Sequence, residues 1–239
     1  KYLSLVATNW LKYTNSDDTE FTYAREVFST ASLDQAYGHL GKGNLVLAGN
    51  FFYESLSFTD DLESHIGYLR AMTQRGQRSA IDERYKNLRE RRFVDDNMKF
   101  VEAMLILIDA EPAVAGGGRS ADTSHLDAAI AKLEAMSQDR DSAVRHLILG
   151  FCYMEKLLRT STALDFDAEL FQKSHRSLML AFDLGRDNVR VKASALMNLG
   201  ILHQRVQNHG LAARFFSLRK PLGFISEEER ARFEALYAR

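Results

Sequence analysis

The sequence predicts an all-α fold built from antiparallel helix pairs. Apolar residues recur at helical spacing from one end of the chain to the other, separated by short polar or glycine-containing links. Among the 239 residues there are only two prolines, Pro112 and Pro221. Long helices tolerate almost no proline in their interior, whereas sheets of short strands need frequent turn residues. Both observations therefore indicate helices throughout.

The apolar periodicity places the helices in chain order. Thr59-Asp60-Asp61 and Asp95 are residue types typical of helix N-termini and precede two of them. Ser226 with Glu229 forms a capping-box pattern at the start of the last. The expected helices span 3–13, 20–38, 43–57, 61–75, 79–92, 96–110, 123–138, 141–158, 168–184, 189–207, 209–219 and 226–238.

The segment 111–124, EPAVAGGGRSADTS, interrupts this pattern with three consecutive glycines. A GGGRS stretch can suggest a phosphate-binding loop, but it lacks the Walker spacing and follows no predicted strand. We therefore expect a flexible link. It would divide the chain into N-terminal helical repeats at 1–111, the link at 112–124, and C-terminal repeats with a capping helix at 125–239.

Composition narrows the function further. Hydrophobic residues make up 46% and charged residues 26% of the chain, with a net charge of −1, which is typical of a globular protein and gives no global attraction to nucleic acid or anionic membranes. The longest apolar run, 103–108, is far too short to span a membrane. Because the chain begins at Lys1, we expect a processed or excised piece of a longer protein. The compartment stays open between cytoplasm, slightly favoured, and periplasm.

The sequence shows no catalytic or metal-binding motif. Cys152 is the single cysteine, so an internal disulfide and a cysteine-based zinc site are excluded. The seven histidines are scattered, with no HExxH and no pair one turn apart, and there is no GxSxG nucleophile. Acidic pairs such as Asp60-Asp61 fall near helix starts, where capping explains them. We expect no enzymatic activity and no cofactor.

One motif recurs three times. In SALMNLGILHQ, Leu196, Leu199-Gly200 and His203 share one helix face, and Ala212 and Phe216 answer from the next helix across the turn Gln207-Asn208-His209-Gly210. His146, Leu149-Gly150 and Tyr153 repeat the first set, as do Leu45, Ala48-Gly49 and Phe52. The answering residues follow later in these two copies, at Ser174, Leu178 and Ala181 and at Ser64, Tyr68 and Ala71.

This spacing resembles the tetratricopeptide repeat (TPR), whose pattern is W-x2-L-G-x2-Y, then A-x3-F, then Pro. Leu196 stands at the tryptophan position, His203 at the tyrosine position and Phe224 at the proline position. The uneven insertions inside the pairs are also similar to Sel1-like repeats. The resemblance covers about two thirds of the chain and implies a right-handed α-solenoid of antiparallel helix pairs, which we expect to hold about five or six hairpins and to end in a capping helix at 226–238.

The resemblance also implies a function, because repeat solenoids present a concave surface that binds other proteins. We expect a scaffold, one module of a larger bacterial-type assembly or regulatory system, whose largely apolar groove takes a peptide or an amphipathic helix, unless another helix of this chain fills it. The lysines and asparagines of the family's carboxylate clamp are not visible here. The groove positions predict the following partner-binding residues: Asn50, Tyr53, Glu54, Phe151, Met154, Met197, Ile201, Gln204 and Arg205.

A basic segment offers an alternative function. From 75 to 92, RGQRSAIDERYKNLRERR carries seven basic and three acidic residues with Tyr85 between them. If the basic side chains converge on one surface, they could bind nucleic acid or another anionic surface. A solvated helix with charge pairs such as Asp82 with Lys86 also explains the pattern. The candidate anion-binding residues are Arg75, Arg78, Arg84, Lys86, Arg89, Arg91 and Arg92.

Overall fold

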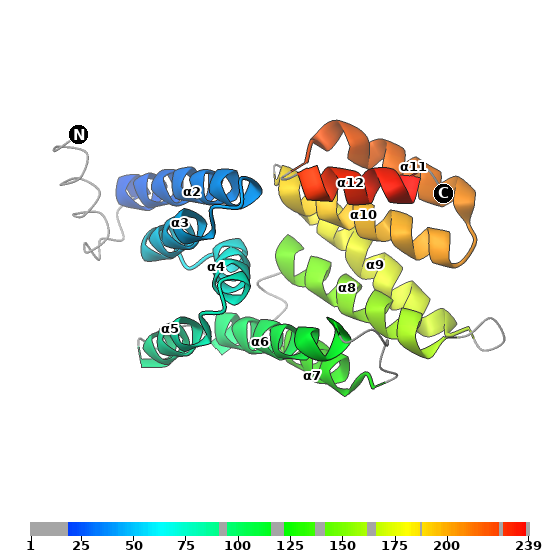
Figure 1. Cartoon of the computed structure of the whole chain (residues 1–239), viewed down its shortest axis with the longest axis horizontal. Helices are drawn as coiled ribbons and strands as arrows, with labels where there is room; N and C mark the ends of the chain where they lie inside the picture. Colours follow the sequence, from blue (N-terminus) through cyan, green and yellow to red (C-terminus); the bar gives the residue numbers. More distant parts are fainter. Residues whose placement is uncertain are drawn as a thin grey trace. The chain divides into compact units, whose positions relative to one another are not determined.

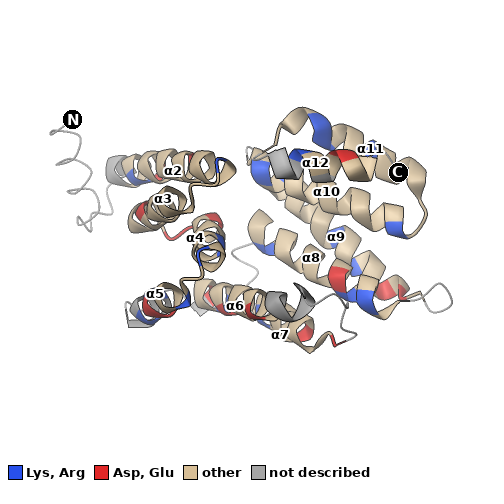
Figure 2. Ribbon diagram, in the orientation of Figure 1, with Lys and Arg blue, Asp and Glu red and all other residues tan. Residues whose placement is uncertain are grey.

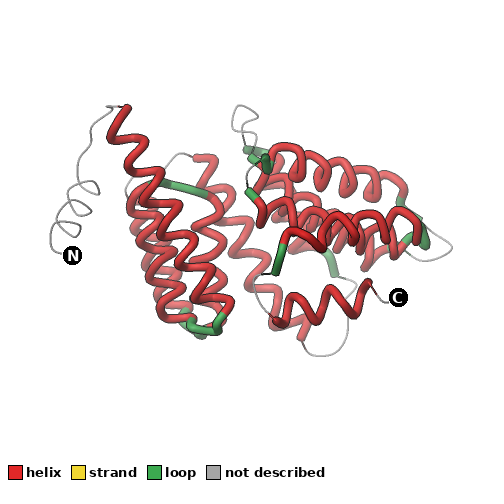
Figure 3. The backbone as a smooth tube through the Cα atoms, turned by 90° about the horizontal axis from the view of Figure 1, so that it is seen from above, coloured by secondary structure: helices red, strands yellow, loops and turns green. Residues whose placement is uncertain are grey.

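The computed structural model describes residues 19–90, 95–115, 122–136, 142–161, 166–186, 188–224 and 227–237, and these are helical apart from short connections (Figures 1 and 3). Contacts within the chain group it into two compact units, Lys1–Arg91 and Arg92–Arg239. No strand occurs in the described ranges. The predicted all-α fold class is confirmed.

The first unit contains α2 (Thr19–Gly41), α3 (Leu45–Phe58), α4 (Leu62–Gln74) and α5 (Arg78–Glu90). In its described residues, the second unit contains three helix pairs followed by a short 3-10 turn and a last helix. These are α6 (Asp95–Ala115) with α7 (Ser124–Glu134), α8 (Ala143–Thr160) with α9 (Ala168–Leu184), α10 (Val189–Arg205) with α11 (His209–Arg219), then η2 (Lys220–Leu222) and α12 (Glu227–Tyr237).

Glycines on α3 and α4 let these two helices approach closely in the first unit. A Cβ added at Gly49 would overlap the end of the Met72 side chain, and one at Gly67 would overlap the ring of Phe52. Phe52 and Ala71 are completely buried. The Ala48-Gly49 copy of the motif is therefore a helix-pair contact, as its spacing predicts.

Buried hydroxyl groups tie α2, α3 and α4 together. The Oγ atoms of Ser55 and Ser29 lie 2.8 Å apart, and Ser55 Oγ also lies 2.8 Å from Ser64 Oγ. Ser64 in turn donates from its Oγ to the carboxylate of Asp61 at 3.1 Å, while its backbone N–H donates to the same oxygen at 2.9 Å. Asp61 is thus the N-cap of α4, as predicted, and the buried hydroxyls are satisfied within the unit.

The second unit repeats the glycine contact twice. A Cβ at Gly150 on α8 would lie 2.6 Å from Cγ of Leu178 and 3.1 Å from its backbone N, and a Cβ at Gly200 on α10 would overlap the ring of Phe216 on α11. Both glycines therefore mark a tight crossing of the two helices of a pair. Between the pairs lies a core cluster of Met154, Leu157, Leu178, Leu199 and Leu202.

Helix α12 closes the C-terminal end of the second unit. Phe233 on α12 is 3% exposed and packs in one cluster with Ala212 and Phe216 of α11. Met197 and Ile201 of α10 also pack against this cluster. The predicted capping helix is present, and it covers the last helix pair of the solenoid.

Three predicted helix ends differ from the structure by three or more residues, and one of them is the end of α2, which lies at Gly41 and not at 38. Helix α6 continues to Ala115, beyond the predicted end at 110, and Pro112 lies in its last turn. Helix α7 ends at Glu134, before the predicted 138. The expected helix at 3–13 and the Ser226 cap lie outside the described residues.

The boundary between the compact units falls between residues 91 and 92, so the Gly-rich segment belongs to the second unit. Residues 116–121, which hold its three glycines, lie outside the described ranges. The interpretation of 112–124 as a flexible link between 1–111 and 125–239 stays a prediction.

Candidate partner-binding site

The first candidate surface is one side of α3, which we call the α3 face: Val46, Leu47, Asn50, Tyr53 and Glu54. Val46 is 51%, Leu47 38% and Tyr53 45% exposed, and Asn50 is also exposed. Val46, Asn50 and Tyr53 are spaced four and three residues apart, so they form one stripe on the helix. The structure therefore brings together the three partner-binding residues predicted on this helix, beside two exposed apolar side chains.

Tyr53 is held in place by its neighbours although much of it is exposed. Its ring lies 6.0 Å from the ring of Tyr68 on α4, and the guanidinium of Arg84 on α5 lies 4.6 Å from its centre. Burial raises the pKa of Tyr68 above its ordinary value, with smaller effects from Arg84 and other neighbours. The exposed Tyr53 of α3 is thus held by one side chain of α4 and one of α5.

One predicted partner residue of α8, Met154, belongs to the core instead, whereas Phe151 is only partly buried. Met154 is 2% exposed and is part of the core cluster, and Phe151 is partly buried against that cluster. Met154 offers no surface to a partner, which corrects its prediction. Helical spacing put both residues on the groove side, but packing between successive pairs covers Met154.

Three of the four predicted groove residues of α10 contact the chain's own last helix. Met197 and Ile201 pack on the cluster containing Phe233, and the side-chain amide of Gln204 donates to the backbone carbonyl of Leu236 on α12 at 3.3 Å. The sequence left open whether the groove is empty or filled by another helix of this chain. On α10, the residues Met197, Ile201 and Gln204 contact α12 or the cluster that contains its Phe233.

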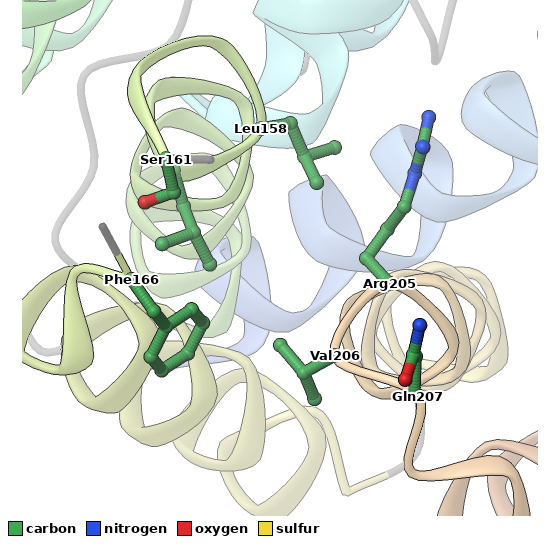
Figure 4. A pocket seen from close by; sticks show the side chains of 7 residues that line it. Leu158, Ser161, Phe166, Arg205, Val206 and Gln207 are labelled. Atoms are coloured by element: carbon green, nitrogen blue, oxygen red, sulfur yellow. The ribbon is translucent and has the colours of Figure 1, made fainter. Parts of the chain in front are cut away.

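Arg205 is the exposed member of the predicted set on α10, and it lines a pocket of about 480 Å³. The pocket opens where α8 ends, α9 begins and α10 ends. Leu158, Ser161 and Phe166 lie on one side of it, and Arg205 and Gln207 lie on the other, with Val206 between them (Figure 4). Leu157 completes the lining. No sequence signal marks this pocket, because its walls come from segments about 40 residues apart.

The structure also brings together two histidines that looked scattered. Nε2 of His203 on α10 lies 3.1 Å from Nδ1 of His175 on α9. The rings of Phe171 and Phe215 lie 5.5 and 5.4 Å from the His203 ring. Burial lowers the pKa of both histidines, and the neighbouring His175 lowers that of His203 further. His175 and His203 therefore form a hydrogen-bonded pair that is packed within an aromatic cluster.

The described ranges offer few groups suited to chemistry. Cys152 is completely buried, and this burial raises the pKa of its thiol to about 12, with a smaller effect from Glu155. Its thiol is therefore protonated near neutral pH and is not a nucleophile. In those ranges no group of three or more His, Cys, Asp or Glu side chains is arranged to hold a metal ion. Nor does any helix there have the length and apolarity to cross a membrane.

The basic segment does not form a uniform patch where its side chains are described. Arg84 is 9% exposed and stacks over Tyr53, and Arg78 pairs with Asp82 at 3.1 Å. Both basic and acidic residues occur on α5 (Figure 2). Arg75 donates to the sulfur of Met72 at 3.7 Å, and Lys86 is exposed. The side chains of Arg89, Arg91 and Arg92 lie outside the description, so anion binding by this segment stays a prediction.

Comparison with known proteins identifies the fold. No family model and no curated protein matches the sequence. The chain is similar to the crystal structure of TTC0263, a thermophilic TPR protein in Thermus thermophilus, with a TM-score of 0.56 and 16% sequence identity. The alignment covers 88% of this chain and 100% of that one. Together with the three glycine contacts, this likeness confirms that the chain has the TPR-like helical-repeat fold that its Leu-Gly and Ala-Gly motifs predict.

Proposed function

We propose that this protein is a non-enzymatic scaffold that binds another protein through the α3 face. The observation that carries the proposal is Tyr53, an exposed aromatic side chain held between Tyr68 and Arg84. Tyrosine, tryptophan and arginine are the residues that most often dominate binding energy at protein interfaces. A ring fixed in place before binding loses little conformational entropy when a partner covers it.

The neighbours of Tyr53 support the same function. Val46 and Leu47 expose apolar surface on the same side of α3, and Asn50 and Glu54 supply polar groups beside it. An exposed apolar patch with a polar rim is typical of a site that a partner covers. Arg84 on α5 is only 9% exposed and lies against the Tyr53 ring, so a second helix helps to hold that ring in place.

The α3 face is accessible to a partner, unlike most of the predicted groove residues on α10. The α10 residues Met197, Ile201 and Gln204 contact α12, so a partner would meet them only if α12 moved away. An amphipathic helix or peptide lying along α3 needs no such rearrangement. We therefore place the main contact on the first unit and keep Arg205 as a separate, smaller site.

Affinity purification with matched variants tests this proposal. The parent protein, Tyr53→Ala and Tyr23→Ala are used as bait in lysate of the source cells, and retained proteins are quantified by mass spectrometry with and without nuclease. Tyr23 is the control because it is 69% exposed on α2 and lies outside the α3 face. We expect a protein retained by the parent and by Tyr23→Ala, independent of nuclease, and weakened by Tyr53→Ala by about 2 kcal/mol, roughly 30-fold in affinity.

Equal retention by all three baits would contradict the proposal, because it would place the contact away from Tyr53. Retention of nucleic acid with no nuclease-resistant protein would instead support the basic segment at 75–92 as the functional surface. Circular dichroism of Tyr53→Ala checks that loss of binding is not loss of fold.

A further inference from the structure

We propose that the pocket lined by Leu158, Phe166, Val206 and Arg205, called here the Arg205 pocket, binds a partner peptide in which an apolar side chain is followed by a carboxylate. This inference rests on the proposed scaffold function and adds a second, chemically defined contact in the second unit. Its volume of about 480 Å³ lies within the range of pockets that enclose small ligands. It can accommodate an apolar side chain together with the adjoining backbone.

The apolar side of the pocket is formed before any ligand arrives. Leu157 in its lining is 2% exposed and belongs to the core cluster of the second unit. Phe166 is 49% exposed, and its ring is held 5.8 Å from the ring of Phe171. An apolar side chain that covered Phe166 and Val206 would remove their exposed surface from water, which is favourable.

The charge of the pocket selects the second group of the ligand. None of the described residues that line the pocket is acidic, and the exposed Arg205 forms no ion pair within the described part of the chain. A guanidinium binds a carboxylate through two parallel hydrogen bonds. A single guanidinium beside apolar walls matches one carboxylate better than a nucleic acid, which needs several cations along its phosphates.

Two polar groups favour a peptide over a free aliphatic acid. Ser161 Oγ accepts a hydrogen bond from the backbone N–H of Asp167 at 3.2 Å, which leaves its O–H available to donate to a peptide carbonyl. Gln207 is exposed across the pocket, and its side-chain amide can both donate to and accept from a peptide backbone. An extended peptide has backbone groups beside each side chain, whereas an aliphatic acid has none.

A peptide array read against charge-reversal variants tests the proposal. The probes are acetylated, fluorescein-labelled hexapeptides in which one position carries Leu, Met, Phe or Val and the next carries Asp, Asn or Lys. Fluorescence anisotropy measures their binding to the full chain. For at least one apolar residue we expect the Asp peptide to bind the parent at least about fivefold more tightly than the Asn peptide, since a charged pair adds electrostatic complementarity.

Variants of the protein test whether the preference for the Asp peptide arises at the Arg205 pocket. Arg205→Glu should abolish the preference for Asp and produce a preference for Lys, whereas Arg214→Glu makes the same charge change at an exposed position on α11 outside the pocket and should behave as the parent. Phe166→Ala, which truncates an exposed side chain, should weaken every apolar peptide. Thermal unfolding of each variant confirms that it is folded.

Two results would overturn the proposal: no preference for Asp with any apolar residue, or the same preference in Arg205→Glu as in the parent. The scaffold function is tested separately, because Tyr53→Ala should leave peptide binding at the Arg205 pocket unchanged. A partner lost with Tyr53→Ala but no array signal would reject the pocket and keep the scaffold. An array signal without such a partner would do the reverse.

Discussion

At the scale of single residues, the buried His175 and His203 show how two side chains can make the stability of the fold depend on pH. Nε2 of His203 lies 3.1 Å from Nδ1 of His175. The ring that accepts this hydrogen bond must be neutral. His203 is only 4% exposed, so a charge there would have to be buried among the rings of Phe171 and Phe215. The pair is stable as two neutral imidazoles.

The lowered pKa values of His175 and His203 predict a loss of stability in mild acid. Both lie below the ordinary value of 6.5, chiefly because burial disfavours the charged form. As the pH falls below about 6.5, the unfolded chain binds protons before the folded chain does, so the free energy of unfolding decreases. Urea unfolding at pH 7.5 and pH 5.5 should show a smaller decrease in His203→Gln than in the parent.

His209→Gln serves as a control for this experiment, because it removes an exposed histidine outside the pair. Its pH dependence should follow that of the parent. If His203→Gln lost as much stability between the two pH values as the parent does, the pair would not be responsible.

At the scale of helices, the repeated Gly is the residue that sets how closely the two helices of a pair approach. Gly49, Gly150 and Gly200 each stand where an added Cβ would overlap a side chain of the partner helix. At Gly150 and Gly200 the overlapped atoms belong to Leu178 close to its backbone and to the Phe216 ring, so a larger residue would force the two helices apart, whereas at Gly49 the overlapped atom is the end of the Met72 side chain, which can move. The motif is therefore a packing signal rather than a binding signal.

Substitution of Gly200 tests this role. Gly200→Leu should lower the free energy of unfolding by about 1–3 kcal/mol or more, because the new side chain meets the ring of Phe216. Gly210→Ala is the matched control, since a Cβ there has no neighbour within 4 Å and a helical alanine is favoured by about 0.4–1 kcal/mol. Chemical denaturation should shift in opposite directions for the two variants. An unchanged midpoint for Gly200→Leu would show that α10 and α11 do not pack as described.

At the scale of the whole molecule, each unit needs its outermost helices to shield the repeats behind them. A repeat buries its apolar face only against its neighbours, so the last one requires a cap. Helix α12 provides it for the second unit: Phe233 meets the ring of Phe216 edge-on at 5.9 Å and that of Phe224 at 5.2 Å. The guanidinium of Arg219 lies 4.6 Å from the centre of the Phe224 ring.

Removing the Phe233 side chain should loosen this cap. Phe233→Ala should cost about 3 kcal/mol of stability, because the ring is 3% exposed and leaves a cavity. Hydrogen exchange should increase along α12 and on the side of α10 that carries Met197 and Ile201. Glu234→Ala, a substitution at an exposed neighbouring position, should change neither. Unaltered exchange in Phe233→Ala would mean that α12 does not depend on this contact.

The features that the sequence predicts correctly are those set by short-range spacing. Asp61 is recognisable as a cap because it stands just before an apolar helix. Gly150 and Gly200 are recognisable because apolar residues three or four positions before and after them lie on the same face of the same helix. The bounds of α9, Ala168–Leu184, and of α11, His209–Arg219, also follow from local periodicity.

Contacts between segments far apart in the chain are decided only by the tertiary structure. The spacing of apolar residues in α8 and α10 would be the same whether Met154 and Met197 faced a partner or the rest of the chain. In the structure Met154 lies in the core, and Met197 packs against the cluster that contains Phe233 of α12. The repeat position of Arg205 is enough to predict it as a candidate. The sequence does not predict that Phe166 forms the opposite wall of the same pocket. A helical pattern states which side chains share a face, and only packing determines what that face meets.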